Sequence, residues 1–152
     1  MLSHIDKKGN AKIVDISNKK ITKRIAVASG MIFVTQEILE QIKKNVTKKG
    51  DIFTVAKIAG IMAAKKTSDL IPLCHPLKID DIQIVYDIDE SKKIIIAQAH
   101  VKCESKTGVE MEALTAISIA LLTIYDMCKA VTHKMKIFDI KLLKKTGGKT
   151  NI

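Results

Sequence analysis

The segment IDDIQIVYDIDESKKIIIAQAHVKC, residues 79–103, is the part of the chain that decides the fold class. Its two halves, residues 79–88 and 94–103, are rich in β-branched residues, which are typical of strands. The polar residues 89–93 separate them and are too many for a two-residue turn. The pattern therefore predicts an antiparallel hairpin joined by a longer loop.

Helical patterns flank this hairpin on both sides. Upstream, Asp51 can cap a helix that ends near Lys66. Downstream, residues 109–131 form a longer helix that is apolar nearly all round and should be buried. The apolar face expected for the upstream helix consists of Val55, Ile58, Ala59 and Met62.

Further elements are expected nearer the two ends. A helix is predicted over residues 35–44 with Thr35 as its N-cap, and strands over residues 10–17, 21–34 and 135–143. Helices and an antiparallel hairpin in one chain indicate an α+β fold, with helices packed on one face of an antiparallel sheet. The length of 152 residues and the absence of a linker suit a single domain over residues 1–152.

Composition limits the class of protein. Hydrophobic residues make up 47% and charged residues 28%, as in a globular protein. The longest strongly apolar segment, residues 113–122, is too short for a membrane span, so no membrane partner is expected. Three cysteines at irregular spacing and no visible secretory signal predict free thiols and a cytoplasmic location.

The chain is strongly basic, with a net charge of +10, and only one of its 26 basic residues, Arg24, is an arginine. A basic surface attracts anions such as nucleic acid or phosphorylated metabolites, although the lysine excess also looks like a compositional bias. Arg24 stands out against that bias. Its planar fork could bind phosphate bidentately, or it could form a buried structural ion pair.

Residues 70–77, LIPLCHPL, hold both prolines and should form a stiff, non-helical loop around His75. An imidazole held there could orient a substrate or transfer protons, or it could be a structural histidine. Cys74 and His75 are adjacent and the chain has no C-x-x-C motif, so no metal site is predicted.

Two groups of charged residues lie at opposite ends of the long helix. Asp126 and Lys129 are three positions apart among apolar neighbours, so we expect a partly buried pair able to transfer protons. Glu110 and Glu112 lie in the first turn, where the helix dipole alone also favours acids. Because Glu112 precedes Asp126 by about 21 Å along the axis, a small ligand cannot touch both within one subunit.

Two lysine-rich segments complete the candidates. Lys48 and Lys49 precede a helix start and could meet a phosphate there, although loop lysines are usually only solvated. The ending GGKT, residues 147–150, is not a P-loop, because the first glycine of that motif is absent and no helix can follow. A flexible basic tail that folds over an anion is the remaining interpretation.

Several of these segments together resemble the molybdenum cofactor biosynthesis protein C (MoaC) family, the cyclic pyranopterin monophosphate synthases. The likeness runs from about Val14 to Lys149. It rests on KGD (49–51), IAGIMAAK (58–65), DLIPLCHPL (69–77), KTGVEMEALTA (106–116), LTIYDMCKAV (122–131) and GGK (147–149). Lys57, Ser105 and Asn151 depart from the usual family pattern.

The resemblance implies a ferredoxin-like subunit in a homohexamer, built as a trimer of dimers, with active sites between subunits. It implies a nucleotide substrate, 3′,8-cyclo-7,8-dihydroguanosine 5′-triphosphate, delivered by a radical S-adenosylmethionine enzyme. Cyclic pyranopterin monophosphate and pyrophosphate would be the products of this phosphorus–oxygen lyase. No protein-bound cofactor is expected, although Mg²⁺ could accompany the triphosphate.

By motif position, the resemblance also implies roles for individual residues. Asp126 and Lys129 would be the catalytic acid/base pair, assisted by Lys49 and His75. Substrate would be bound by Leu73, Cys74, His75, Met111 and Glu112, with the triphosphate held by Arg24, Lys145 and Lys149.

Two other classes of function stay open on the sequence. A basic nucleic-acid-binding module would suit the charge, but five Phe and Tyr residues and no Trp offer few stacking surfaces. We therefore expect no nucleic-acid partner. A non-catalytic assembly protein is the other alternative, and turnover with the expected substrate would exclude it.

Overall fold

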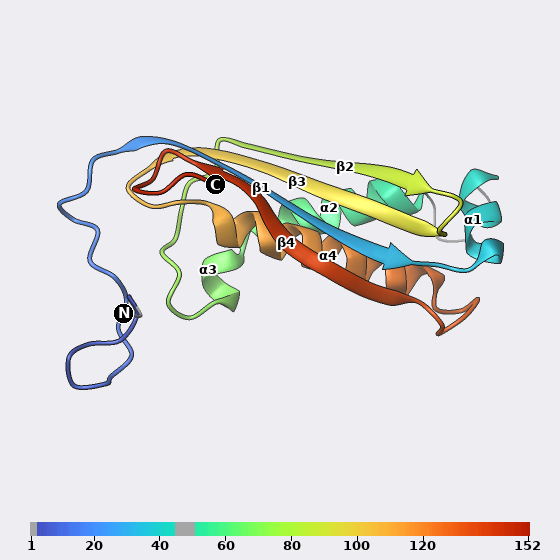
Figure 1. The fold of residues 1–152 in the computed structure, drawn as a ribbon, viewed down its shortest axis with the longest axis horizontal. Helices are drawn as coiled ribbons and strands as arrows, with labels where there is room; N and C mark the ends of the chain where they lie inside the picture. Colours follow the sequence, from blue (N-terminus) through green and yellow to red (C-terminus); the bar gives the residue numbers. More distant parts are fainter. Residues whose placement is uncertain (1–2, 45–50) are drawn as a thin grey trace.

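The computed structural model describes residues 3–44 and 51–152, and its centre is a four-stranded antiparallel sheet (Figure 1). The strands are β1 (Thr22–Phe33), β2 (Asp81–Asp89), β3 (Ile94–Ser105) and β4 (Lys136–Thr146), in the spatial order β2-β3-β1-β4. The predicted hairpin is confirmed, since β2 pairs with β3 from Asp81 opposite Lys102 to Asp89 opposite Ile94. Strand β1 lies between β3 and β4, and its pairing with β3, from Thr22 opposite Ser105 to Phe33 opposite Ile94, is the longest of the sheet.

In the described part of the chain, four helices accompany the sheet: α1 (Gln36–Lys43), α2 (Ile52–Lys65), the one-turn α3 (Thr67–Leu70) and α4 (Glu110–Cys128). Helices α2 and α4 pack side by side and cover the same face of the sheet (Figure 1). The α+β class with helices on one face is therefore confirmed. The order β-α-β-β-α-β is compatible with a ferredoxin-like fold.

The core lies between this sheet face and α4. Alternate residues of β1 and β3, such as Ala28 and Ala99, are fully buried against Ile117 and Leu121 of the helix. By length and composition alone α4 could cross a membrane, but 44% of its most apolar stretch is buried inside the protein. The buried side of α4 packs against β1 and β3.

Helix α2 presents a different face to the core from the one that the sequence indicated. Apart from Ile52, its buried residues are small, while Val55, Ile58 and Met62 are exposed. At Gly60 an added Cβ would lie 2.9 Å from the Ala116 carbonyl oxygen, so α2 and α4 approach too closely for larger side chains. The core-facing residues are Ile52, Ala56, Gly60, Ala63 and Ala64.

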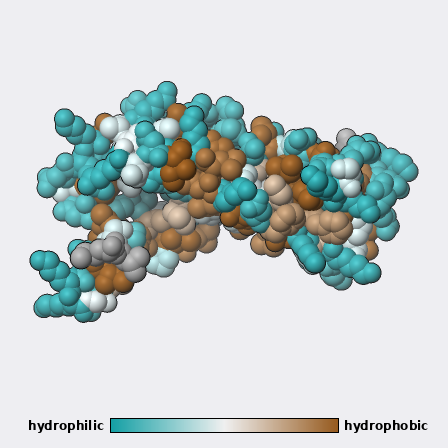
Figure 2. Space-filling model, in the orientation of Figure 1, coloured by the Kyte–Doolittle hydropathy of each residue, from teal (hydrophilic) through white to brown (hydrophobic). Residues whose placement is uncertain are grey.

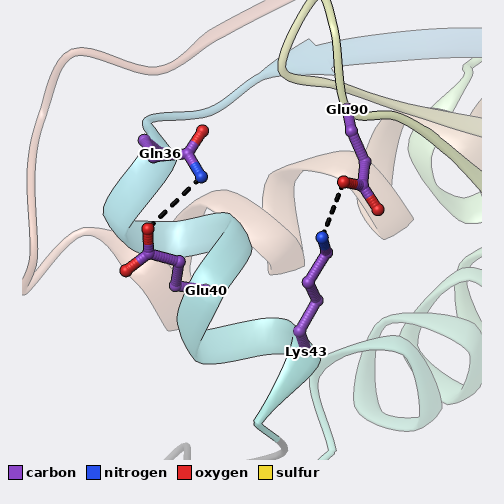
Figure 3. A network of polar contacts seen from close by, with 4 residues as sticks. All are labelled: Gln36, Glu40, Lys43 and Glu90. Carbon is purple, nitrogen blue, oxygen red and sulfur yellow. Dashed lines mark hydrogen bonds and ion pairs between the residues drawn. The ribbon is translucent and has the colours of Figure 1, made fainter.

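Helix α1 closes the far end of the sheet. Thr35 occupies its N-cap position as predicted, but its side chain makes no capping bond. The last turn is tied to the β2–β3 loop by an ion pair of 2.6 Å between Lys43 Nζ and Glu90 Oε2, beside a Gln36–Glu40 hydrogen bond (Figure 3). Because these side chains are exposed, the ion pair adds little stability.

Two predicted boundaries near the termini were wrong. Residues 10–17 form no strand, because they lie away from the sheet and have no strand to pair with (Figure 1). Strand β4 runs on to Thr146 instead of ending at Leu143. The residues beyond it fold back, and the backbones of Lys145 and Ile152 exchange two hydrogen bonds of 3.1 and 3.0 Å.

Candidate active site

A small pocket of about 250 Å³ lies where the loop after α3 meets the start of α4; we call it the histidine pocket. Five of the predicted substrate-binding residues line it, brought together from two segments about 35 positions apart. These are Leu73, Cys74, His75, Met111 and Glu112. The other lining residues are His4, Leu77, Thr107, Gly108 and Glu110.

The loop that carries His75 is non-helical, as its two prolines predicted. It follows α3 directly, and the Cys74 N–H donates to the Ile71 carbonyl at 3.1 Å. His75 is half-buried in the pocket wall. The imidazole is thus held against the first turn of α4 without being part of a helix.

Glu112 is the most perturbed acid of the site. Its side chain is only 4% exposed, and burial raises its pKa to about 7, with a smaller contribution from the neighbouring charge of Glu110. Burial also raises the pKa of the Cys74 thiol, and Glu112 and Glu110 add to that effect. A carboxyl group with a pKa near 7 can both donate and accept protons at neutral pH.

Glu110 is a site residue to which the sequence assigned no role. Its carboxylate forms an ion pair with Lys145 of β4, and both side chains are mostly buried. It also lies directly over Gly108, where an added Cβ would collide with Glu110 Oε2. The only sequence signal for Glu110 was its place in a helix's first turn, which the helix dipole explains equally well.

A second hollow of about 470 Å³, the cationic hollow, contains two of the predicted triphosphate-binding residues, Arg24 and Lys149. Lys19 and Lys20 also line it, and the sequence did not distinguish them from the many other lysines. Asp15, Asn18, Thr22 and Gly148 complete the lining. Four cationic side chains in one hollow make it suited to a polyanion.

Arg24 is buried, with 8% of its surface exposed, and its contacts are with backbone carbonyls. Its Nε donates to the Ser105 carbonyl and its Nη2 to the Lys106 carbonyl, both at 3.2 Å. These bonds fix the guanidinium at the edge of the hollow and leave its other N–H groups for a ligand. Gly147 lies against the same strand with φ of +86°, and a Cβ there would meet the Lys23 carbonyl oxygen at 2.0 Å.

Lys145 lies between the histidine pocket and the cationic hollow. Its partner Glu110 lines the histidine pocket, and a Cβ on Gly148 of the cationic hollow would lie 3.6 Å from Lys145 Cε. All three residues predicted to hold a triphosphate are therefore grouped beside the pocket that contains His75 and Glu112. One nucleotide could place its ring system in the pocket and its phosphates in the hollow.

Asp126 and Lys129 lie elsewhere. Lys129 Nζ is 2.6 Å from Asp126 Oδ1, but the side chains are 51% and 57% exposed, so the expected burial is wrong for the single chain. The pair borders a surface hollow of about 510 Å³ near the end of α4. That hollow lies about 21 Å along the helix from Glu112. The bond to Asp126 raises the pKa of Lys129, so this lysine stays charged.

The exposure has a physical cause. The helix is apolar nearly all round, but only one side of it faces the sheet, and Leu122 beside this hollow is 53% exposed.

Lys49, which was also predicted to be catalytic, lies outside the described residues. Over residues 3–44 and 51–152, no group of three His, Cys, Asp or Glu side chains could hold a metal ion.

Comparison with known proteins gives one consistent result. The model of the MoaC family matches residues 13–148. A cyclic pyranopterin monophosphate synthase of Clostridium perfringens (strain SM101) is 55% identical over 149 residues, which cover 98% of this chain and 94% of that protein. One of Campylobacter jejuni (strain RM1221) is 54% identical, covering 98% and 95%.

A longer relative matches equally well. The molybdenum cofactor biosynthesis protein moc-5 of Caenorhabditis elegans is 54% identical over 152 residues. The match covers 99% of this chain but spans only a quarter, 25%, of the length of that protein.

Proposed function

The chain belongs to the MoaC family, and from that membership we propose that it is a cyclic pyranopterin monophosphate synthase of molybdenum cofactor biosynthesis. One structural observation carries the proposal. Separate segments converge on a pocket with His75 and a carboxyl group of pKa about 7, beside a hollow lined by Arg24 and Lys149. That arrangement suits a nucleotide triphosphate whose ring system must gain and lose protons.

We propose that the substrate is 3′,8-cyclo-7,8-dihydroguanosine 5′-triphosphate, supplied by a radical S-adenosylmethionine enzyme in the cytoplasm. The enzyme would act as a phosphorus–oxygen lyase. A sugar hydroxyl passes its proton to an acid/base group of the site as its oxygen bonds to the α-phosphorus, the bond from that phosphorus to the bridging oxygen breaks, and pyrophosphate leaves. Arg24, Lys145 and Lys149 stabilise the charge that develops on this leaving group.

Proton transfers accompany the opening and rebuilding of the purine-derived ring. Glu112 is placed for this work, because a pKa near 7 keeps both of its protonation states populated at neutral pH. His75 lies in the same pocket, and its imidazole is a second candidate for the proton transfers. No resident cofactor is needed for such steps, and we propose that any Mg²⁺ arrives with the triphosphate.

The distance between the two ends of α4 supports a site that is shared between subunits. Asp126 and Lys129 cannot reach a ligand in the histidine pocket of their own chain, about 21 Å away. We propose that they complete the pocket of a neighbouring copy within a homohexamer built as a trimer of dimers. Exposed apolar side chains beside the pair and along α2, including Leu122, Ile58 and Met62, are available for such contacts.

Apolar surface on the face of the molecule that Figure 2 shows supports the same assembly. Hydrophobic side chains lie over the middle of the molecule, where β4 and α4 run, while the ends are hydrophilic (Figure 2). Exposed apolar patches of this kind are typical of surfaces that bind other proteins. A second copy of the chain is the occupant that would also complete the active site.

Turnover of the proposed substrate tests the function directly. The purified protein should convert it to a cyclic phosphate and release one pyrophosphate per product, which ³¹P NMR resolves. Asp126→Asn should abolish turnover while size-exclusion chromatography shows the same oligomer. A wild-type protein that binds the substrate but releases no pyrophosphate would refute the lyase and favour a non-catalytic role.

A further inference from the structure

His4 is the one residue of the histidine pocket that comes from the N-terminal segment. It lines the pocket together with Cys74, His75 and Glu112, although it precedes them by about 70 positions or more. It also lies outside residues 13–148, which the family model matches. Figure 1 shows the N-terminal segment folded beside the loop that follows α3, apart from the sheet.

The segment around His4 is a small hairpin, residues 3–12, which we call the N-terminal hairpin. Ile5 and Ala11 form an antiparallel bridge, and the Lys12 N–H donates to the His4 carbonyl at 2.9 Å. The His4 backbone is therefore engaged in the hairpin, and the residue, although exposed, lines the pocket. The side chain is not needed for the hairpin's own hydrogen bonds.

The turn of this hairpin is organised by one carboxylate. Asp6 Oδ1 accepts from the backbone N–H groups of Lys8 and Asn10, at 2.8 and 2.9 Å, and these bonds lower the pKa of Asp6. Gly9 supplies the left-handed conformation, with φ of +85°. Local bonds thus define the shape of a segment that contributes nothing to the buried core.

The segment that follows the hairpin is tethered to the body of the protein near the same site. Lys106 Nζ donates to the Ser17 carbonyl at 2.7 Å, and the Lys106 carbonyl accepts from Arg24. Residues 15–20 pass along the cationic hollow, which Asp15, Lys19 and Lys20 line. The N-terminal segment therefore runs past the proposed phosphate site and ends at the proposed ring site.

We propose that the N-terminal hairpin is a strap over the histidine pocket and that His4 is a further substrate-binding residue, which hydrogen-bonds the ring system of the nucleotide. The inference rests on the proposed function and deepens it. An imidazole can donate one hydrogen bond and accept another, and the ring of a guanine-derived nucleotide offers both kinds of partner. A hairpin held by local hydrogen bonds presents this group at a lower entropic cost than an unstructured segment would.

Kinetics of matched variants test the proposal. His4→Ala should lower kcat/KM about tenfold, as expected for a lost ligand hydrogen bond, and His4→Gln, which keeps a donor and an acceptor, should recover most of it. Lys7→Ala, on the same hairpin but outside the pocket, should stay within about twofold of the wild type. A His4→Ala variant that matches the wild type would overturn the proposal.

A chemical footprint tests the same contact without turnover. Diethyl pyrocarbonate carbethoxylates accessible histidines, and peptide mass spectrometry gives the rate at each of the four. GTP, used as the probe at saturating concentration, should slow the reaction of His4 and His75 but leave that of the exposed His133 unchanged. The result at His4 is thus measured against internal controls.

The outcomes distinguish the proposed role of His4 from the proposed lyase function. Protection of His75 without His4 would refute the strap and leave the proposed site standing. Protection of both in a protein that fails to convert the proposed substrate would refute the lyase and keep His4 as a nucleotide contact. Protection of neither would overturn the inference, because no nucleotide would then occupy the histidine pocket.

Discussion

Lys129 and Asp126 form an ion pair of 2.6 Å in which about half of each side chain is exposed to solvent. An exposed pair of this kind is screened by water and ions and holds its partners only loosely. It becomes a sheltered proton-transfer pair only if something covers it. We propose that the cover is a second copy of the chain, and this makes the active site dependent on the oligomer.

Mixed oligomers should reveal the shared site. Asp126→Asn and His75→Ala should each lower turnover by about 10²–10⁴-fold, the usual contribution of acid–base groups. Co-expression of the two should restore part of the activity, because some sites then take both intact groups from different subunits. Turnover per milligram of purified mixed oligomer is the measurement.

A matched mixture provides the control for that experiment. Asp126→Asn combined with Lys129→Ala should not recover, since both residues lie at the same end of the same helix. Equal recovery in the two mixtures would contradict the arrangement. No recovery in either would indicate that each site is complete within one subunit.

The buried carboxyl of Glu112 should make stability depend on pH. Burial raises its pKa from 4.5 to about 7, so the folded chain binds more protons than the unfolded chain between those values. Stability attributable to this group therefore falls as the pH rises from about 4.5 to 7, by about 3 kcal/mol at most. Glu112→Gln removes the ionisation and should be more stabilising at pH 8 than at pH 5.

Denaturant unfolding of the two proteins at both pH values measures this difference. Glu104→Gln, at an exposed carboxyl on β3, is the control and should show no such dependence. The pH–rate profile should lose its ionisation near pH 7 in Glu112→Gln. An unchanged profile would remove Glu112 from the proton transfers.

Arg24 should not tolerate replacement by lysine. Its two hydrogen bonds to the Ser105 and Lys106 carbonyls come from separate nitrogens of a planar group, which an ammonium cannot reproduce. Arg24→Lys should lower the free energy of unfolding by about 1–2 kcal/mol and raise KM for the substrate about tenfold. Lys23→Arg, at the exposed neighbouring position, should change neither quantity.

Gly60→Ala should destabilise the protein, although alanine normally favours a helix over glycine by about 0.5–1 kcal/mol. The added Cβ would lie 2.5 Å from Ile84 Cδ1 and 2.9 Å from the Ala116 carbonyl oxygen, so the helices must separate. We expect a loss of about 1–3 kcal/mol in denaturant unfolding. Lys57→Ala, on the exposed side of α2, should change stability by less than about 0.5 kcal/mol.

Local sequence patterns predicted most of the elements. The hairpin of β2 and β3, strand β1 and helix α4 were predicted because each has a strong pattern and pairs or packs along its whole length. Residues 10–17 have strand-like composition too, but no neighbouring strand supplies the hydrogen bonds. A strand needs a partner, and composition alone does not reveal whether one is present.

The same limit explains the error on α2. Two faces of α2 carry no charged residue. The hydrophobic pattern favoured the face with larger side chains, which includes Ile58 and Met62, as the one that packs on the core. The structure packs the smaller face, centred on Gly60, because α4 approaches closely there. The choice depends on how closely α2 and α4 approach each other. The spacing of apolar residues along one helix does not give that distance.

The sequence by itself determined the α+β class, the family and five of the residues that line the pocket, because long motifs around His75 and Glu112 carry that information in residue type alone. Only the tertiary structure decided which of them meet. It placed Glu112 in a water-poor pocket that shifts its pKa, joined Glu110 to Lys145, brought His4 to the pocket and left Asp126 exposed. Burial and proximity depend on the packing of segments far apart in the chain, so they arise only when the chain folds.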